Sequence, residues 1–250
     1  MRHAAPGLKI EPGSWVMFLA AWWTGAAVSA APAVSDGGAP AITPFSVLVF
    51  LAFCALLLIK PAAPAALKQR AFRPVLYMAL PPLAVLAGAA WLKPSLASFY
   101  LAGGVLMAIY FFIERKSHFY AEIAGMAVMG LAAAVSVAVN NWNAVWNDGG
   151  PLPGIRLGLL FFAFFLSSPL RVRLASPKYR KAAIVYSGVI LACSISAGLS
   201  GHPVFFAFLP LAEDLFSAIR KRTKENFRAI GITESVKTVT FAILVAVLFN

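Results

Sequence analysis

Residues 153–181 read PGIRLGLLFFAFFLSSPLRVRLASPKYRK, an apolar stretch followed directly by five Lys and Arg residues. The part up to Leu170 is close to the length of a bilayer-crossing helix, which needs about 20 mostly apolar residues. Short loops rich in Lys and Arg stay on the cytoplasmic side of a membrane. The stretch therefore predicts a membrane span together with the side on which it ends.

The same arrangement repeats along the chain, with positive charge in every second gap between apolar segments. Five stretches hold 18 of the 21 Lys and Arg residues, namely 1–13, 60–74, 114–118, 171–181 and 220–228. The gaps between them contain only Lys93 and Arg156, and Lys237 lies inside an apolar segment. This alternation is typical of a polytopic membrane protein and predicts an N-terminus inside and a C-terminus outside.

Composition supports the same class of protein. The chain is 61% hydrophobic and 12% charged, whereas soluble domains carry about 25% charged residues. We predict an all-α membrane bundle of about nine transmembrane helices in a single domain, residues 1–250. The first span is expected to remain uncleaved, although residues 28–31 resemble a signal-peptide cleavage region. The predicted spans are 14–33, 45–60, 75–92, 95–113, 119–139, 153–170, 182–199, 202–219 and 232–249.

The net charge of +12 is explained by topology and by contact with anionic lipid headgroups, so no nucleic-acid partner is expected. Cys54 and Cys193 lie in apolar segments and are interpreted as small core residues. The sequence contains no nucleotide-binding, zinc-binding or nucleophile-elbow motif. No metal and no cofactor are therefore predicted.

The acidic residues are few enough to weigh singly. Glu114, Glu122 and Glu234 lie at span ends next to the basic face, and Glu213 and Asp214 lie within the segment 202–219. Ionisable groups at such depths usually face a cavity or a partner. The three glutamates are candidate catalytic or proton-handling residues. The alternative is a set of ion pairs that hold helices together, with Arg115, Arg173 and Lys237 as partners.

The basic gaps are the second candidate site. Their side chains can form a basin for a phosphate group, although topology and headgroup contact also explain them. The candidate ligand-binding residues are Lys68, Arg70, Arg73, Arg115, Arg171 and Arg173.

Three segments resemble the YwiC-like membrane proteins. Residues 8–15 (LKIEPGSW) are similar to the family's opening, with Pro12 where the family has His. Residues 114–122 (ERKSHFYAE) resemble its Glu-Arg-Ser segment, and residues 227–235 (FRAIGITES) its Ile-Gly-x-x-Glu segment. The resemblance implies a bacterial inner-membrane location and a layout similar to UbiA-type prenyltransferases. Those enzymes hold Mg²⁺ with Asp-rich motifs, whereas stretches 60–74 and 171–181 contain no acid, so Mg²⁺-diphosphate chemistry is not expected.

Three functions follow as hypotheses. In the first, an anionic lipid or isoprenoid phosphate binds between helices, with its tail against Phe161, Phe162, Phe164 and Phe165; any reaction would be transfer of a prenyl or other lipid group. In the second, Glu213, Asp214, Glu234 and Lys237 form a proton or ion relay in a small-solute transporter. In the third, the protein is a non-catalytic assembly partner in the membrane. The oligomeric state is left open.

Overall fold

The computed structural model describes residues 12–35, 43–59, 72–114, 117–140, 152–174, 176–220 and 227–249. Within these residues all regular structure is helical and no strand is present. The elements are α1 (Pro12–Ser35), α2 (Pro44–Ile59), α4 (Phe72–Leu92), α5 (Ser95–Glu114), α6 (His118–Asn140), α8 (Leu152–Phe165), α9 (Ser167–Val172), α10 (Pro177–Leu199), the 3₁₀ helix η1 (Pro203–Phe208), α11 (Leu211–Ile219) and α12 (Phe227–Leu248).

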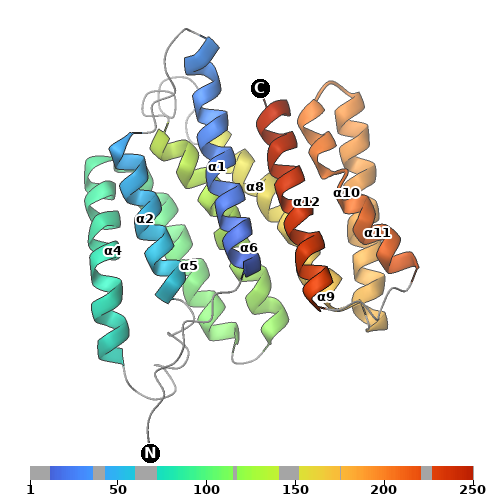
Figure 1. Ribbon diagram of the computed structural model, residues 1–250, viewed down its shortest axis with the longest axis horizontal. Helices are drawn as coiled ribbons and strands as arrows, with labels where there is room; N and C mark the ends of the chain where they lie inside the picture. Colours follow the sequence, from blue (N-terminus) through green and yellow to red (C-terminus); the bar gives the residue numbers. More distant parts are fainter. Residues whose placement is uncertain are drawn as a thin grey trace, which may run out of the picture.

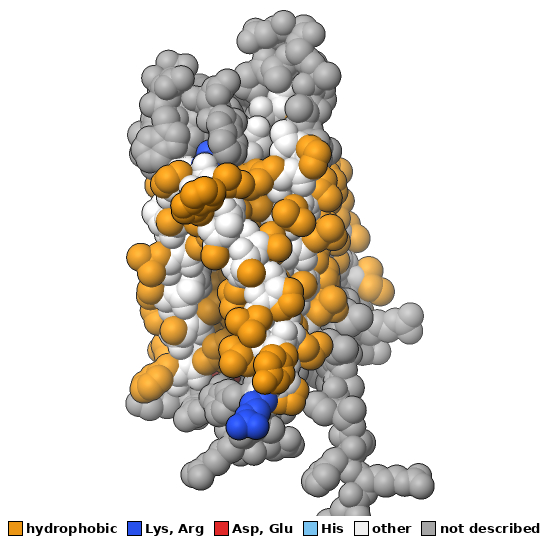
Figure 2. Space-filling model, turned by 90° about the vertical axis from the view of Figure 1, so that its left-hand side faces the viewer, with side chains coloured by type: hydrophobic (Ala, Val, Ile, Leu, Met, Phe, Trp, Pro, Cys, Tyr) orange, Lys and Arg blue, Asp and Glu red, His pale blue; other side chains and the backbone are white. Residues whose placement is uncertain are grey.

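The helices stand side by side and run alternately up and down (Figure 1). The helix ends that flank the four internal basic gaps all lie in the lower half of that view. The basic gaps of the sequence therefore begin and end at the same end of the bundle. The apolar side chains between the two ends form the surface that a bilayer would cover, as Figure 2 shows for the face nearest α4.

Six helices in the described part of the chain are long and apolar enough to cross a membrane: Arg73–Leu92, Ser95–Glu114, His118–Asn140, Gly154–Val172, Pro177–Leu199 and Ala229–Leu248. Two shorter apolar helices, Ser14–Ala30 and Pro44–Ile59, accompany them. The expectation of an all-helical chain with several helices long and apolar enough to span a membrane is confirmed for the described residues.

The prediction of one continuous helix over 202–219 is wrong. This segment consists of η1 and the nine-residue α11, and Pro210 caps the start of α11. Proline has no N–H to donate and favours the first turn of a helix, so Pro203 and Pro210 each begin a new helical piece. The segment Gly154–Val172 is divided into α8 and α9 only by a turn at Leu166, whose backbone stays helical and whose N–H donates to the carbonyl of Phe162 at 3.0 Å.

Helix α6 forms the centre of the bundle, in contact with α1, α5 and α8. In the most apolar part of α6, 61% of the residues are buried, compared with 11% in the corresponding part of α5. Helix α5 therefore lies at the periphery. Gly130 allows the close contact between α6 and α8, because a Cβ atom there would lie 2.7 Å from the carbonyl oxygen of Gly158. Small residues at helix crossings permit such contacts in membrane proteins.

Aromatic side chains fill the core on both sides of α6. Phe18 and Trp22 of α1 pack against Phe50 of α2, with ring centroids 5.8 and 5.4 Å apart. On the other side, Phe164 stacks on Phe241 of α12 at 4.0 Å. These contacts join α1, α2, α8 and α12 into one hydrophobic core.

Candidate functional site

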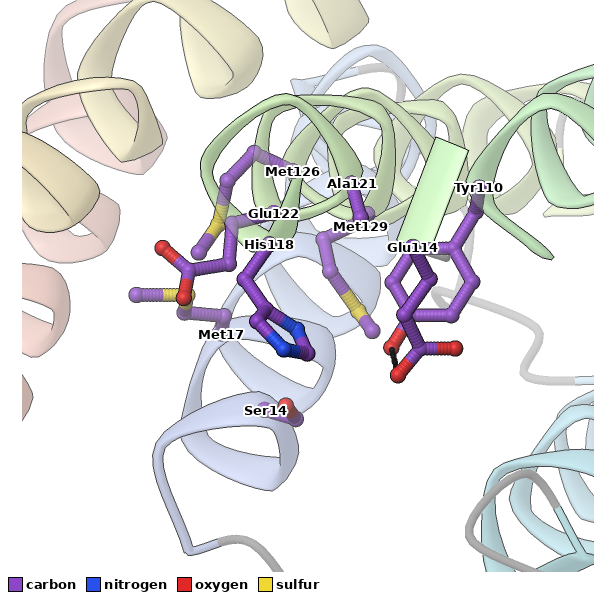
Figure 3. Close-up of a pocket in the computed structure, with 10 residues that line it drawn as sticks. Ser14, Met17, Tyr110, Glu114, His118, Ala121, Glu122, Met126 and Met129 are labelled. Carbon is purple, nitrogen blue, oxygen red and sulfur yellow. Dashed lines mark hydrogen bonds between the residues drawn. The ribbon is translucent and has the colours of Figure 1, made fainter. Parts of the chain in front are cut away.

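A cavity of about 350 Å³ lies between the start of α1, the end of α5 and the start of α6 (Figure 3). It belongs to the end of the bundle where the basic gaps begin and end. The lining residues are polar or ionisable near the helix ends and rich in methionine further along α6. They are Ser14, Met17, Tyr110, Glu114, His118, Ala121, Glu122, Gly125, Met126 and Met129.

Helix geometry explains why these side chains meet. On α6, His118, Glu122 and Met126 are four residues apart, a spacing that places them on one face. On α5, Tyr110 and Glu114 have the same spacing, and the tyrosine hydroxyl donates a hydrogen bond to the Glu114 carboxylate at 3.5 Å. Because α5 ends at Glu114 and α6 begins at His118, the two helix faces line the same cavity.

Glu122 is held in the pocket wall by Arg173. The two guanidinium nitrogens donate to the two carboxylate oxygens at 2.6 and 2.8 Å, a bidentate pair. The guanidinium also lies 5.4 Å from the ring of Phe119 and 6.0 Å from that of Tyr179. The hydrogen bond to Glu122 raises the pKa of Arg173 above its ordinary value. Arg173 therefore stays positively charged and neutralises Glu122.

A second group of charges, here termed the buried charge cluster, joins α9, α11 and α12. It consists of Arg171, Glu213, Asp214, Glu234 and Lys237. Arg171 donates to Glu213 at 3.0 Å and its Nε lies 3.9 Å from Asp214. The Lys237 ammonium donates to Asp214 and lies 2.5 Å from Glu234. One oxygen from each of the three carboxylates lies within 4.8 Å of the others.

Helix α9 connects the pocket and the buried charge cluster. Arg171 lies in its last turn and contacts the cluster, while Arg173 caps its end and holds Glu122 in the pocket wall. Arg171 is only 3% exposed. Two arginines separated by one residue thus serve two different carboxylate sites.

The predicted site residues are divided among several places. Glu114 and Glu122 line the same pocket, and Arg173 reaches it through Glu122. Arg171 and Glu234 belong instead to the buried charge cluster. Arg73 is exposed near the start of α4. Lys68, Arg70 and Arg115 lie outside the described residues.

The phenylalanines expected to contact a lipid tail are mostly occupied by the protein itself. Phe161, Phe164 and Phe165 are buried, and the first two pack against Phe241 at 5.1 and 4.0 Å. Phe162 is half-buried.

Several lining residues were not singled out from the sequence: Ser14, Met17, Tyr110, His118, Met126 and Met129. The spacing of four residues, from 110 to 114 in one helix and from 118 to 126 in the next, is a signal that would have pointed to three of them, Tyr110, His118 and Met126. Ser14 and Met17 carry no comparable signal, since they come from a distant helix.

Comparison with known proteins found no matching family model, curated protein or solved structure.

Proposed function

We propose that this chain is a multi-pass membrane protein that binds an amphipathic, lipid-like ligand in the pocket between α1, α5 and α6. An isoprenoid or lipid phosphate is the leading class. The same proposal includes nine spans with the N-terminus inside and a bacterial inner-membrane location. It also includes kinship with YwiC-like and UbiA-type proteins. The pocket itself carries it, since it combines ionisable groups at the end of the bundle with a methionine-rich interior.

The depth of the pocket suits an amphipathic molecule. His118 is the first residue of α6 and Met129 lies eleven positions further on, or about 16 Å along the helix axis at 1.5 Å per residue. Flexible thioether side chains adapt to apolar ligands of irregular shape. A polar headgroup near Glu114 and His118 would therefore place its apolar part against Met126 and Met129.

Charge favours an anionic headgroup over the face as a whole. The four internal basic gaps that flank this end of the bundle hold 16 of the 21 Lys and Arg residues, which attract anions from the membrane surface. Within the pocket, Arg173 neutralises Glu122. Glu114, which accepts a hydrogen bond from Tyr110, is the second carboxylate of the pocket. It would act as the base in any group transfer.

Native mass spectrometry of protein extracted in mild detergent tests the proposal. Gly125 lines the pocket, and a Cβ atom there would lie 3.8 Å from the Tyr110 ring, so Gly125→Leu fills the cavity. A Cβ atom at Gly104 would meet nothing within 4 Å, so Gly104→Leu is the matched control. We expect a copurifying lipid in the wild type and in Gly104→Leu and its loss in Gly125→Leu. Equal retention in all three folded proteins would refute the pocket.

The buried charge cluster favours a second candidate function, a proton- or cation-coupled transporter. It brings together the four residues expected for an ion relay and adds Arg171. Its element α11 is a short helix that follows the interruption after η1, and interrupted helices form ion sites in transporters. Proteoliposomes with a pH-sensitive dye inside would show a potential-driven proton flux that Glu234→Gln abolishes. No flux in the wild type would remove this candidate.

A further inference from the structure

The buried charge cluster contains more acids than bases. Three carboxylates, from Glu213, Asp214 and Glu234, face two cations, Arg171 and Lys237. Asp214 is 2% exposed, Arg171 3% and Lys237 5%. With every group ionised, the described residues of the cluster would carry one uncompensated negative charge inside the bundle.

In the described part of the chain, the elements packed against the cluster add no further salt bridge to its three carboxylates. The sequences of α1 from Ser14 to Ala30 and of η1 contain no ionisable residue. At the start of α10, Lys178 and Lys181 are exposed and Arg180 is half-buried, and Arg220 at the end of α11 is exposed. Tyr186 donates its hydroxyl hydrogen to the carbonyl of Ala163. Ser167 and Ser168, at the start of α9, add hydrogen-bonding groups without charge.

An unpaired charge is among the most costly groups to bury, and a buried carboxyl avoids the cost by taking up a proton. We infer that the buried charge cluster is a proton-binding site in which Asp214 and Glu234 share one exchangeable proton over Lys237. The site is separate from the lipid pocket. It deepens the second candidate function by naming its ion, and it holds even if the protein conducts no protons.

The contacts decide which carboxyls share the proton. Glu213 accepts hydrogen bonds from Arg171 at 3.0 Å and from Ser217 at 2.7 Å, and its side chain is 34% exposed, so it is the carboxylate that already has a cation of its own and contact with solvent. Asp214 and Glu234 contact the ammonium of Lys237 directly, whereas Glu213 lies further from it, at 3.6 Å. Each of the three carboxylates has one buried oxygen without a hydrogen-bond partner, namely Oε2 of Glu213, Oδ2 of Asp214 and Oε1 of Glu234. The Asp214 side chain is the least exposed of the three, at 3%, so an O–H group there is less costly than a charged oxygen.

Infrared spectroscopy of the purified full-length protein detects this proton directly, because a protonated carboxyl has a carbonyl band that shifts in D₂O. We expect such a band in the wild type at pH 7 in sodium-free buffer. Asp214→Asn and Glu234→Gln should each abolish it, since either change leaves two carboxylates for the two cations of the cluster. Glu122→Gln, in which an ion-paired carboxylate is removed, is the control and should keep the band.

Three results would overturn the inference: no protonated carboxyl in the wild type, a band unchanged in both cluster variants, or a band displaced by sodium, which would assign the site to a metal cation. If Asp214→Asn and Glu234→Gln do not fold, Asp214→Glu and Glu234→Asp replace them, because these two variants retain the carboxyl groups. Each variant should shift the frequency of the band. A band whose frequency is unchanged in both variants would contradict the site. Failure of the lipid experiment leaves this result untouched, because the readout requires no ligand in the pocket.

Discussion

At the scale of single residues, burial distinguishes basic side chains that the sequence presents as equals. Most Lys and Arg residues lie in the basic gaps, but Lys93 lies in the turn between α4 and α5, at the opposite end of the bundle. It is 4% exposed and donates a hydrogen bond to the carbonyl of Ala138. Burial disfavours its charged form and lowers the pKa of Lys93 to about 8.

This shift predicts how stability depends on pH. Between pH 8 and the ordinary lysine pKa of about 10.4, the unfolded chain binds a proton at Lys93 that the folded protein does not. Stability therefore rises as the pH increases through this range. We expect the difference in melting temperature between wild type and Lys93→Met to change between pH 7.5 and pH 10. A constant difference would mean that Lys93 does not titrate in this range.

At the scale of helices, close packing depends on positions where no side chain fits. A Cβ atom at Gly130 would lie 2.7 Å from the Gly158 oxygen and 3.0 Å from the backbone nitrogen of Phe162. Backbone atoms cannot move aside as a flexible side chain can. The α6–α8 contact would have to open, which would disturb α6, the helix in contact with both the pocket and the core.

Gly130→Ala should therefore destabilise the protein by about 1–3 kcal/mol, the typical cost of overpacking. Gly104→Ala is the matched control, because a Cβ atom there would meet nothing within 4 Å and alanine favours helices. Thermal or denaturant unfolding in the same detergent measures both. A loss of stability in Gly104→Ala as large as that in Gly130→Ala would count against close packing as the cause.

At the scale of the whole molecule, the long helices run alternately up and down (Figure 1), so the two ends of each long helix lie at opposite ends of the bundle. Lys178 and His202 are exposed and lie at opposite ends of α10. Lys178 belongs to a basic gap, which the charge rule assigns to the cytoplasm.

Cysteine labelling in intact cells tests this orientation. In a background with Cys54 and Cys193 replaced by alanine, a membrane-impermeant maleimide should label His202→Cys in intact cells. It should label Lys178→Cys only after lysis, because the reagent cannot reach the cytoplasm. The reverse pattern would invert the topology and place the pocket on the outer side.

The sequence by itself determined the helical class, the alternation of charge and most helix positions, because apolar length and loop charge are local properties of the chain. It also identified Glu114 and Glu122 near the basic face. It missed the break between η1 and α11, although Pro210 marks the position, since the surrounding residues are as apolar as those of a continuous span.

Only the tertiary structure decided which charges meet. Arg171 and Arg173 are near neighbours in one basic gap, yet one reaches the buried charge cluster and the other the pocket. Glu213 and Glu234 come together although 21 positions separate them in the sequence. The physical reason is that a long side chain at a helix end can extend to the headgroups or turn inward to a partner. The choice depends on where a distant helix places its carboxylates, which no local pattern records.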